Sequence, residues 1–266
     1  MNTYTEKYEL AKQLYLEGKS LTKIAKQVGI ERHKLSYLLK KDGITIIQNG
    51  AKHEYIENIF EIIDIEEKAY WLGFLYADGS ISKGNRNDIE LSLCLNDIHH
   101  LEKFKTFIGF GGKLIIDDFR CRISFKNKNM KKDLMNKGCV PQKSLTIKFP
   151  SNDIVPKELI RHFIRGYFDG DGSISCTDKT HSLCVLGTLD MMEHICYESG
   201  IPRKIYISKS PNNSTYRILL DDKRDSLIFL HYLYDDCEIY LDRKYNKCKL
   251  LIDYFTAVRG RKSTKY

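Results

Sequence analysis

The chain has 266 residues, which is long enough to bury a substantial core. Its composition, 42% hydrophobic and 29% charged, is typical of an ordinary soluble protein. Its net charge of +8 indicates a polyanionic partner. No apolar run approaches the ~18 residues of a membrane span, and the first residues do not form a signal peptide. Eight cysteines without a CxxC pair argue against zinc and against a disulfide framework. We therefore expect a reducing compartment, either a cytoplasm (prokaryotic or phage-encoded) or an organelle, and no membrane.

Residues 1–46 are predicted to form a small all-α domain. Apolar residues at helical spacing predict a first helix, Ser20 caps a second over 21–27, and a third runs from about residue 31 to 41 after a break at Gly29. This arrangement resembles the helix-turn-helix family. The resemblance implies that part of the third helix enters the major groove of DNA. The residues expected to face the groove are Arg32, His33, Lys34, Ser36 and Tyr37. The alternative is a three-helix packing or partner-binding module.

Residues 47–68 are expected to be an acidic connector without chemistry of its own. Two similar stretches follow at a separation of 93 positions, WLGFLYADGSIS at 71–82 and IRGYFDGDGSIS at 164–175. Asp64 and Glu67 predict a capping box before the first stretch, and Pro156 predicts a helix start before the second. Each helix is expected to end in a left-handed conformation at its glycine, Gly79 or Gly172.

Small residues lie four apart inside both predicted helices. They are Gly73 and Ala77 in the first helix and Gly166 and Gly170 in the second. Residues at this spacing share one face, and a face of small residues lets two backbones approach closely. We therefore expect the two helices to pack against each other.

Each of these helices ends at an aspartate, Asp78 or Asp171. The negative end of the helix dipole disfavours a carboxylate by roughly 0.3–1 kcal/mol. Two such carboxylates facing each other suit a hard divalent cation with oxygen ligands. The alternative is that Asp-Gly is simply a turn former, but repetition of the whole pattern favours a functional role.

The rest of the chain repeats loosely as helix, two strands, helix, two strands and helix. The repeats are expected at 69–150 and 151–258, followed by a basic tail at 259–266. Predicted strands include 113–119, 121–126 and 204–208. A duplicated chain implies a pseudo-two-fold molecule, and that symmetry matches a DNA duplex.

The segments LGFLYADG at 72–79 and RGYFDGDG at 165–172 resemble the two signatures of a single-chain LAGLIDADG homing endonuclease. The resemblance implies an α+β fold in which two pseudo-symmetric αββαββα repeats form a saddle of antiparallel sheets over DNA. It also implies Mg²⁺ at the scissile phosphates, with Mn²⁺ expected to substitute, bound by Asp78 and Asp171 with Ala77 and Gly170 beside them. Tyr76 and Arg165 depart from the signature; we expect Tyr76 to face the core and Arg165 to point away from the helix crossing.

The expected activity is double-strand cleavage of a long specific site by a monomer, one cut per strand across the minor groove, leaving staggered 3′ overhangs. Lys143 and Lys244 end the two halves at matching places and would offset phosphate charge near each cut. Exposed strand faces and loops supply candidate DNA contacts, although a merely solvated polar face is the alternative for a share of them. The candidates are Ser80, Ser82, Lys83, Asn85, Arg86, Asn87, Lys113, Arg120, Arg122, Ser173, Ser175, Lys179, Arg203, Lys209, Asn212, Asn213 and Arg217.

Two other functions remain open from the sequence. The first is a DNA-binding transcriptional regulator of the same architecture that does not cut. The second is a maturase in which the basic saddle binds intron RNA.

Overall fold

The computed structural model describes residues 4–17, 19, 21–44, 56, 58–176, 180–201, 205–207 and 215–260. The chain divides into two compact units, Met1–His53 and Glu54–Tyr266, and each is described by itself. Among the described residues, no helix has both the length and the apolar character needed to cross a membrane.

The N-terminal unit consists of three helices around a small apolar core. The helices are α1 (Tyr4–Leu16), α2 (Leu21–Val28) and α3 (Arg32–Lys41). Gly29 breaks the chain between α2 and α3 with a φ of +70°, a conformation that favours glycine. The core contains Ala11, Leu14, Leu21, Ile24, Val28, Ile30, Leu35 and Leu39. On α3, Leu35 and Leu39 face inward, which leaves Arg32, His33, Lys34 and Tyr37 exposed and Ser36 half-buried.

The larger unit begins with a half built on one antiparallel sheet, ordered β1-β2-β4-β3. Side chains of β4 alternate strictly between buried and exposed, so one face of this sheet packs on the core and the other is open. The elements of this half are α4 (Glu66–Asp78), β1 (Gly79–Ile81), β2 (Asp88–Cys94), the 3₁₀ turn η1 (Leu95–Asp97), α5 (Ile98–Phe107), β3 (Ile115–Ile116), β4 (Arg120–Lys126), α6 (Lys128–Asn136) and η2 (Lys143–Leu145).

The second half has a sheet with the same connection order, β5-β6-β8-β7, also antiparallel throughout. Its elements are η3 (Lys157–Leu159), α7 (Ile160–Asp171), β5 (Gly172–Cys176), β6 (His181–Gly187), α8 (Leu189–Ser199), β7 (Ile205–Ile207), β8 (Tyr216–Leu220), α9 (Lys223–Tyr234) and α10 (Asp242–Gly260). The larger unit is therefore a mixed α and β fold with antiparallel sheets, as the sequence predicted.

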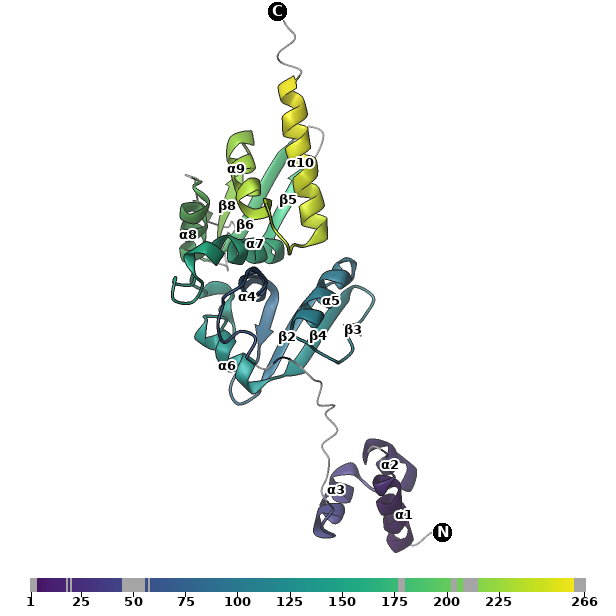
Figure 1. Cartoon of the computed structure of the whole chain (residues 1–266). Helices are drawn as coiled ribbons and strands as arrows, with labels where there is room; N and C mark the ends of the chain where they lie inside the picture. Colours follow the sequence, from purple (N-terminus) through teal and green to yellow (C-terminus); the bar gives the residue numbers. More distant parts are fainter. Residues whose placement is uncertain are drawn as a thin grey trace, which may run out of the picture. The chain divides into compact units, whose positions relative to one another are not determined.

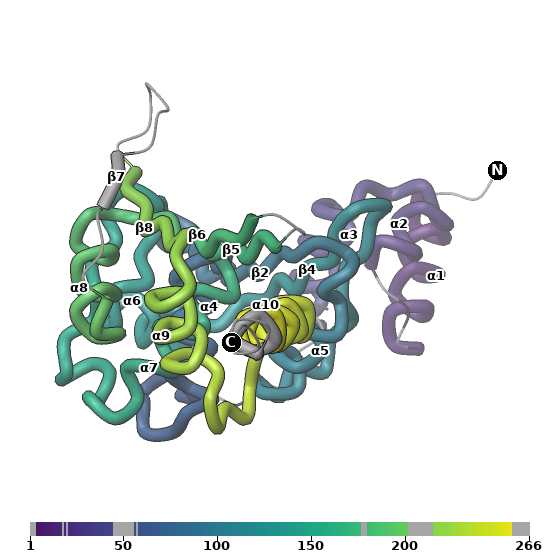
Figure 2. Tube along the Cα trace, turned by 90° about the horizontal axis from the view of Figure 1, so that it is seen from above, coloured from purple at the N-terminus to yellow at the C-terminus, as the bar shows by residue number. Residues whose placement is uncertain are grey.

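Helices α4 and α7 lie side by side at the centre of the larger unit, between the two sheets (Figure 1). Eight consecutive residues of α4, from Ala69 to Tyr76, are buried. Such a helix is apolar on all sides because it is surrounded by protein. One continuous hydrophobic core joins both sheets through these helices. Helix α10 packs along β5 and is seen nearly end-on in Figure 2.

The predicted helix start and stop signals were partly wrong. Ile65, not Asp64, precedes α4, and Asp64 pairs instead with Lys68 at 2.7 Å. Gly79 and Gly172 leave their helices in extended conformations, with φ of −72° and −86°. Glycine is required there for space: a β-carbon on Gly79 would lie 2.6 Å from the Leu75 carbonyl oxygen.

Strand lengths also differ from the prediction. The strand predicted at 113–119 is reduced to Ile115–Ile116. The carboxylate of Asp117 accepts hydrogen bonds from the backbone N–H groups of Phe119 and Arg120 at 3.1 and 2.8 Å, which closes a turn where the strand was expected to continue.

Candidate active site

The site starts from the crossing of α4 and α7, where the two backbones touch. A β-carbon on Gly73 would lie 2.0 Å from the Phe163 carbonyl oxygen, and one on Gly166 would lie 1.9 Å from the Tyr70 carbonyl oxygen. Real β-carbons do not occur at such distances. The small residues therefore permit a crossing that any side chain would force apart.

The crossing brings the two C-terminal aspartates together. A β-carbon on Gly170 would lie 2.2 Å from the Ala77 β-carbon and 3.4 Å from Asp78 Oδ2, so the Asp78 carboxylate lies against α7 one residue before Asp171. Asp78 and Asp171 are both exposed. Two acidic groups from separate helices thus share one open surface.

Crowding by protein raises the pKa of both carboxyl groups even though they remain accessible to water. For Asp171, desolvation and then the negative charge of Asp78 raise the pKa from 3.8 to about 6. For Asp78, desolvation raises the pKa while the positive charges of Lys244, Lys143 and Arg243 oppose the rise. The two neighbouring carboxyl groups, Asp78 and Asp171, therefore favour binding of a proton or a cation.

Lys143 and Lys244 are buried and bind the ends of the signature helices. Lys244 Nζ donates to the carbonyl oxygens of Phe168, Asp169 and Gly172 at 2.6, 2.7 and 2.5 Å, and a longer contact of 3.4 Å reaches Gly170. Lys143 Nζ donates to the carbonyl oxygen of Gly79. A cation at these carbonyls offsets the negative end of the helix dipole. Burial lowers the pKa of Lys244 to about 8.

The residue two positions before each acid anchors the segment that leads to the lysine. In α7, Asp169 accepts a hydrogen bond from the backbone N–H of Leu241 at 2.8 Å, three residues before Lys244. In α4 the equivalent residue is Tyr76, which is buried as expected and donates to the carbonyl oxygen of Lys137. Tyr76 departs from the signature, but its hydrogen bond still holds α4 to the segment that leads to Lys143.

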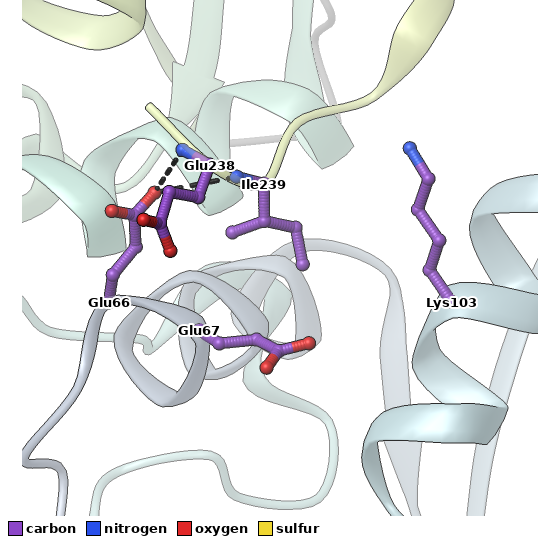
Figure 3. Close-up of a pocket in the computed structure, with 5 residues that line it drawn as sticks. All are labelled: Glu66, Glu67, Lys103, Glu238 and Ile239. Carbon is purple, nitrogen blue, oxygen red and sulfur yellow. Dashed lines mark hydrogen bonds between the residues drawn. The ribbon is translucent and has the colours of Figure 1, made fainter. Parts of the chain in front are cut away.

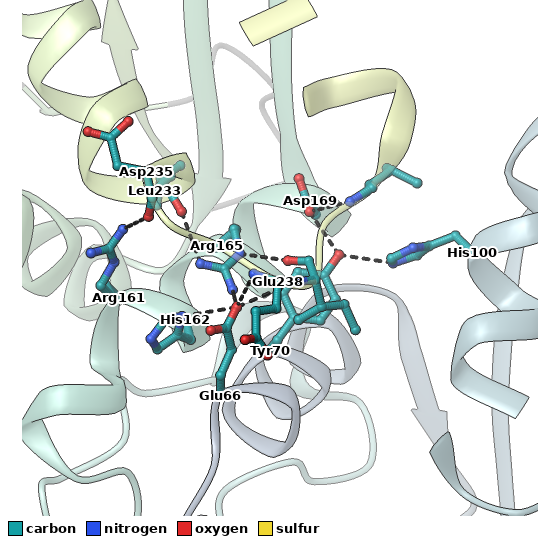
Figure 4. A network of polar contacts seen from close by, with 12 residues as sticks. Glu66, Tyr70, His100, Arg161, His162, Arg165, Asp169, Leu233, Asp235 and Glu238 are labelled. Atoms are coloured by element: carbon teal, nitrogen blue, oxygen red, sulfur yellow. Dashed lines mark hydrogen bonds and ion pairs between the residues drawn. The ribbon is translucent and has the colours of Figure 1, made fainter. Parts of the chain in front are cut away.

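Asp169 also lies in a buried network that joins the two halves (Figure 4). It accepts hydrogen bonds from Tyr70 at 2.8 Å and Tyr234 at 2.6 Å, and the Tyr70 hydroxyl in turn contacts His100 Nε2 at 2.9 Å. Burial raises the pKa of Asp169 and lowers that of His100 to about 3. The network therefore links an uncharged imidazole in the first half, through Tyr70, to Asp169 in the second half.

Arg165 does not point away from the helix crossing, and this expectation was wrong. It is fully buried and bonds Glu66 of α4 at 2.5 Å, as well as the carbonyl oxygens of Ile239 and Leu233 at 2.8 and 3.0 Å (Figure 4). A buried guanidinium needs such partners because an unpaired charge in the interior is costly. Arg165 thus joins the two signature helices.

A separate hollow of about 290 Å³ lies at the opposite end of α4 from Asp78 (Figure 3). It is lined by Glu66, Glu67, Lys103, Glu238 and Ile239. Helix α4 has 13 residues and so spans about 20 Å. The hollow is therefore remote from the two carboxylates.

The predicted DNA contacts divide into three groups. On the first sheet and its loops, Ser80, Lys83, Asn85, Arg86, Lys113, Arg120 and Arg122 are exposed, whereas Ser82 and Asn87 are half-buried. Ser82 Oγ donates to the Arg86 carbonyl oxygen at 2.7 Å and thereby shapes the β1–β2 loop. On the second sheet Ser173 and Ser175 are exposed and Arg217 is half-buried. Outside the described residues lie Lys179, Arg203, Lys209, Asn212, Asn213 and most of the basic tail.

The residues present fit a divalent cation of the Mg²⁺ type. Mg²⁺ is commonly bound through one or two carboxylates, with water and substrate phosphate completing its shell. Asp78 and Asp171 supply two carboxylates on an open surface. Within the described ranges, no group of three or more His, Cys, Asp or Glu side chains is placed to hold a metal.

Comparison with known proteins identifies the fold. Residues 158–234 match the family described as LAGLIDADG-like domain. The LAGLIDADG homing endonuclease I-GzeII in complex with its DNA target is similar over 76% of this chain and 93% of its own, with 12% identity and a TM-score of 0.51. The I-SmaMI LAGLIDADG homing endonuclease bound to cleaved DNA is similar over 73% and 90%, with 14% identity and a TM-score of 0.50. No match was found among curated proteins.

The chain therefore shares the fold of LAGLIDADG homing endonucleases, and residues 158–234 match a LAGLIDADG-like domain. At 12–14% identity the likeness to these solved structures is one of fold.

Proposed function

We propose that the protein is a site-specific DNA endonuclease that cuts both strands of a long target. The observation that carries this proposal is the meeting of Asp78 and Asp171 at the ends of two closely packed helices, on a surface between two antiparallel sheets. The net charge of +8 supports a nucleic-acid partner. Solved proteins of the same fold carry DNA, as I-GzeII does with its target.

In this proposal each half of the larger unit contacts one half of the target. The matching orders of the two sheets support a pseudo-symmetric pair of repeats. The open face of the first sheet, with Arg120 and Arg122, would lie along the DNA, and Ser173 and Ser175 would do so on the second sheet. Arginine binds phosphates or guanine edges, and serine binds either phosphates or bases.

Asp78 and Asp171 would hold Mg²⁺ or Mn²⁺ at the two scissile phosphates, with the backbone at Ala77 and Gly170 beside them. A bound Mg²⁺ supplies a more acidic water for attack and neutralises charge on the phosphate. Because the pKa of Asp171 is raised to about 6, a cation would displace a proton from this carboxyl group when it binds near or below pH 6. Lys143 and Lys244 hold the helix ends in place and add positive charge next to the acids.

The two carboxylates share one spot at the helix crossing. We therefore propose that the cuts fall a few base pairs apart across the minor groove and leave staggered 3′ overhangs. The N-terminal unit would act as a helix-turn-helix, with the exposed residues Arg32, Lys34 and Tyr37 of α3 in the major groove. It would extend the site, and one copy of the chain would suffice.

The test is to incubate the purified protein with Mg²⁺ and duplex DNA from its own genomic neighbourhood and to map the ends. The proposal expects one position cut on each strand, with both cuts lost when the metal is chelated. Binding without any cut would instead indicate a regulator of the same architecture, and tighter binding of intron RNA than of duplex DNA would indicate a maturase.

A further inference from the structure

Arg243 belongs to neither signature, but its positive charge is one of those that act on the Asp78 carboxylate. It stands one residue before Lys244 at the start of α10. Its Nε donates to both carboxylate oxygens of Asp97 at 2.9 Å each. Asp97 is only 6% exposed and ends the 3₁₀ turn before α5. The neighbouring Lys244 Nζ contacts the carbonyl oxygen of Gly170, the residue that the Asp78 carboxylate lies against.

Lys244, Lys143 and Arg243 all act on Asp78. They differ in how many of their N–H groups remain free to bind a phosphate. The ammonium groups of Lys244 and Lys143 are buried against helix-end carbonyls and reach a phosphate only by breaking those bonds. The side chain of Arg243 is 50% exposed, and its bonds to Asp97 use Nε alone. Its two terminal amino groups make no hydrogen bond to any residue that the structure describes. A planar guanidinium held at one edge offers its other donors to a phosphate.

Arg243 is among the strongest charges that act on Asp78 but not among the strongest that act on Asp171. The strongest charges acting on the Asp171 carboxyl group are those of Asp78, Lys143 and Lys244. Asp97 comes from the first half of the larger unit and Arg243 from the second. The ion pair therefore joins the two halves of the larger unit.

We propose that Arg243 is a phosphate-binding residue that serves the cut governed by Asp78, and that Asp97 is the positioning residue that orients it. The ligand is a DNA phosphate next to that scissile bond. This inference deepens the proposed nuclease function and rests on it. Its consequence is that the two cuts differ, because only one of them has the additional cation.

The first experiment measures binding without metal, using a duplex selected for binding to the full chain from a randomised library. Arg243→Met should reduce the slope of log Kd against log salt by about 0.9, as expected for one lost phosphate contact. Lys103→Met is the matched control, because Lys103 and Asp242 form another ion pair between α5 and α10, at 2.9 Å, and Lys103 is not among the strongest charges that act on Asp78. The control should keep the wild-type slope.

The second experiment follows each strand of the duplex separately with Mg²⁺ in single-turnover conditions. Arg243→Met should slow one strand about tenfold or more, the same strand that Asp78→Asn stops, and should leave the other within about threefold, so that nicked duplex accumulates. Asp97→Asn should slow that same strand less, and Asp97→Glu should restore part of the rate. Arg243→Lys should retain the salt slope but not the full rate.

An unchanged salt slope in Arg243→Met, or equal slowing of both strands, overturns the inference. If the wild-type chain binds the selected duplex but cuts neither strand, the nuclease function is wrong, and the salt slope still decides whether Arg243 binds phosphate. If the wild-type chain has no affinity for duplex DNA, both proposals fail.

Discussion

The carbonyl oxygen of Tyr70 lies 1.9 Å from the position that a β-carbon on Gly166 would occupy. This relationship fixes how closely α4 and α7 approach and therefore how closely Asp78 and Asp171 meet. The geometry of the site therefore depends on a backbone contact as well as on the side chains that the two helices carry.

Gly166→Ala should destabilise the larger unit by about 3 kcal/mol or more, because the added methyl group must push the two backbones apart. Thermal unfolding of the variant measures this loss. Gly29→Ala is the control. A β-carbon on Gly29 would meet no atom within 4 Å, so the substitution is opposed only by the positive φ of this residue. Its cost should be about 1 kcal/mol and should be confined to the N-terminal unit. Equal melting temperatures for the Gly166→Ala variant and the wild type would contradict the close crossing of α4 and α7.

Glu66→Gln should destabilise the fold by about 3 kcal/mol, because it leaves the fully buried Arg165 without a charged partner. Denaturant unfolding gives the free energy. The double variant Glu66→Gln/Arg165→Met should be less destabilised than Arg165→Met alone, since removing both charges leaves none unpaired. Simple additivity of the two single substitutions would argue against the pair.

Asp171 gives a pH dependence of stability with an unusual sign. Folding raises its pKa from 3.8 to about 6, so the folded state binds the proton more tightly, and the free energy of unfolding falls as pH rises through this range. Asp171→Asn should remove this penalty and raise Tm at pH 8 but not at pH 3. The exposure of the group limits the gain to about 1 kcal/mol, or about 2–4 °C for a unit of this size.

Asp117→Asn is the control for this pH effect. Backbone N–H groups of Phe119 and Arg120 hold the pKa of Asp117 below its ordinary value, so neutralising it should bring no gain at pH 8. A similar rise in Tm for both variants would mean that the effect reflects overall charge rather than the site.

Removal of residues 1–46 should weaken DNA binding about tenfold or more and shorten the protected footprint, while cleavage at the same bonds persists. The reason is that two modules joined by one connector gain affinity through effective concentration. Footprinting of the full and shortened chains measures both quantities. Unchanged affinity and footprint length would remove the N-terminal unit from DNA recognition.

The sequence predicted the central helices and most strands because their signals are local. Glycine and alanine four residues apart mark a helix face, and alternation marks strands such as β4. The conformation at Gly79 was not predictable in this way. Glycine is needed either for a positive φ or for space, and only the position of the Leu75 carbonyl oxygen distinguishes the two reasons.

Long-range pairs account for what the sequence did not reveal. Arg165 in an apolar helix was expected to face outward because its partner, Glu66, is 99 positions away. Asp97 and Arg243 are 146 positions apart and belong to neither signature. Asp169 lies inside a signature, but its role depends on the Leu241 backbone and on Tyr70, which only the folded chain brings close.

The most direct test of the central claim compares the wild-type chain with Asp78→Asn and Asp171→Asn on one duplex, with DNA affinity and the cleavage of each strand measured together. The account predicts that each substitution leaves affinity within about threefold and abolishes double-strand cleavage in Mg²⁺. Undiminished cutting of both strands by either variant would contradict it.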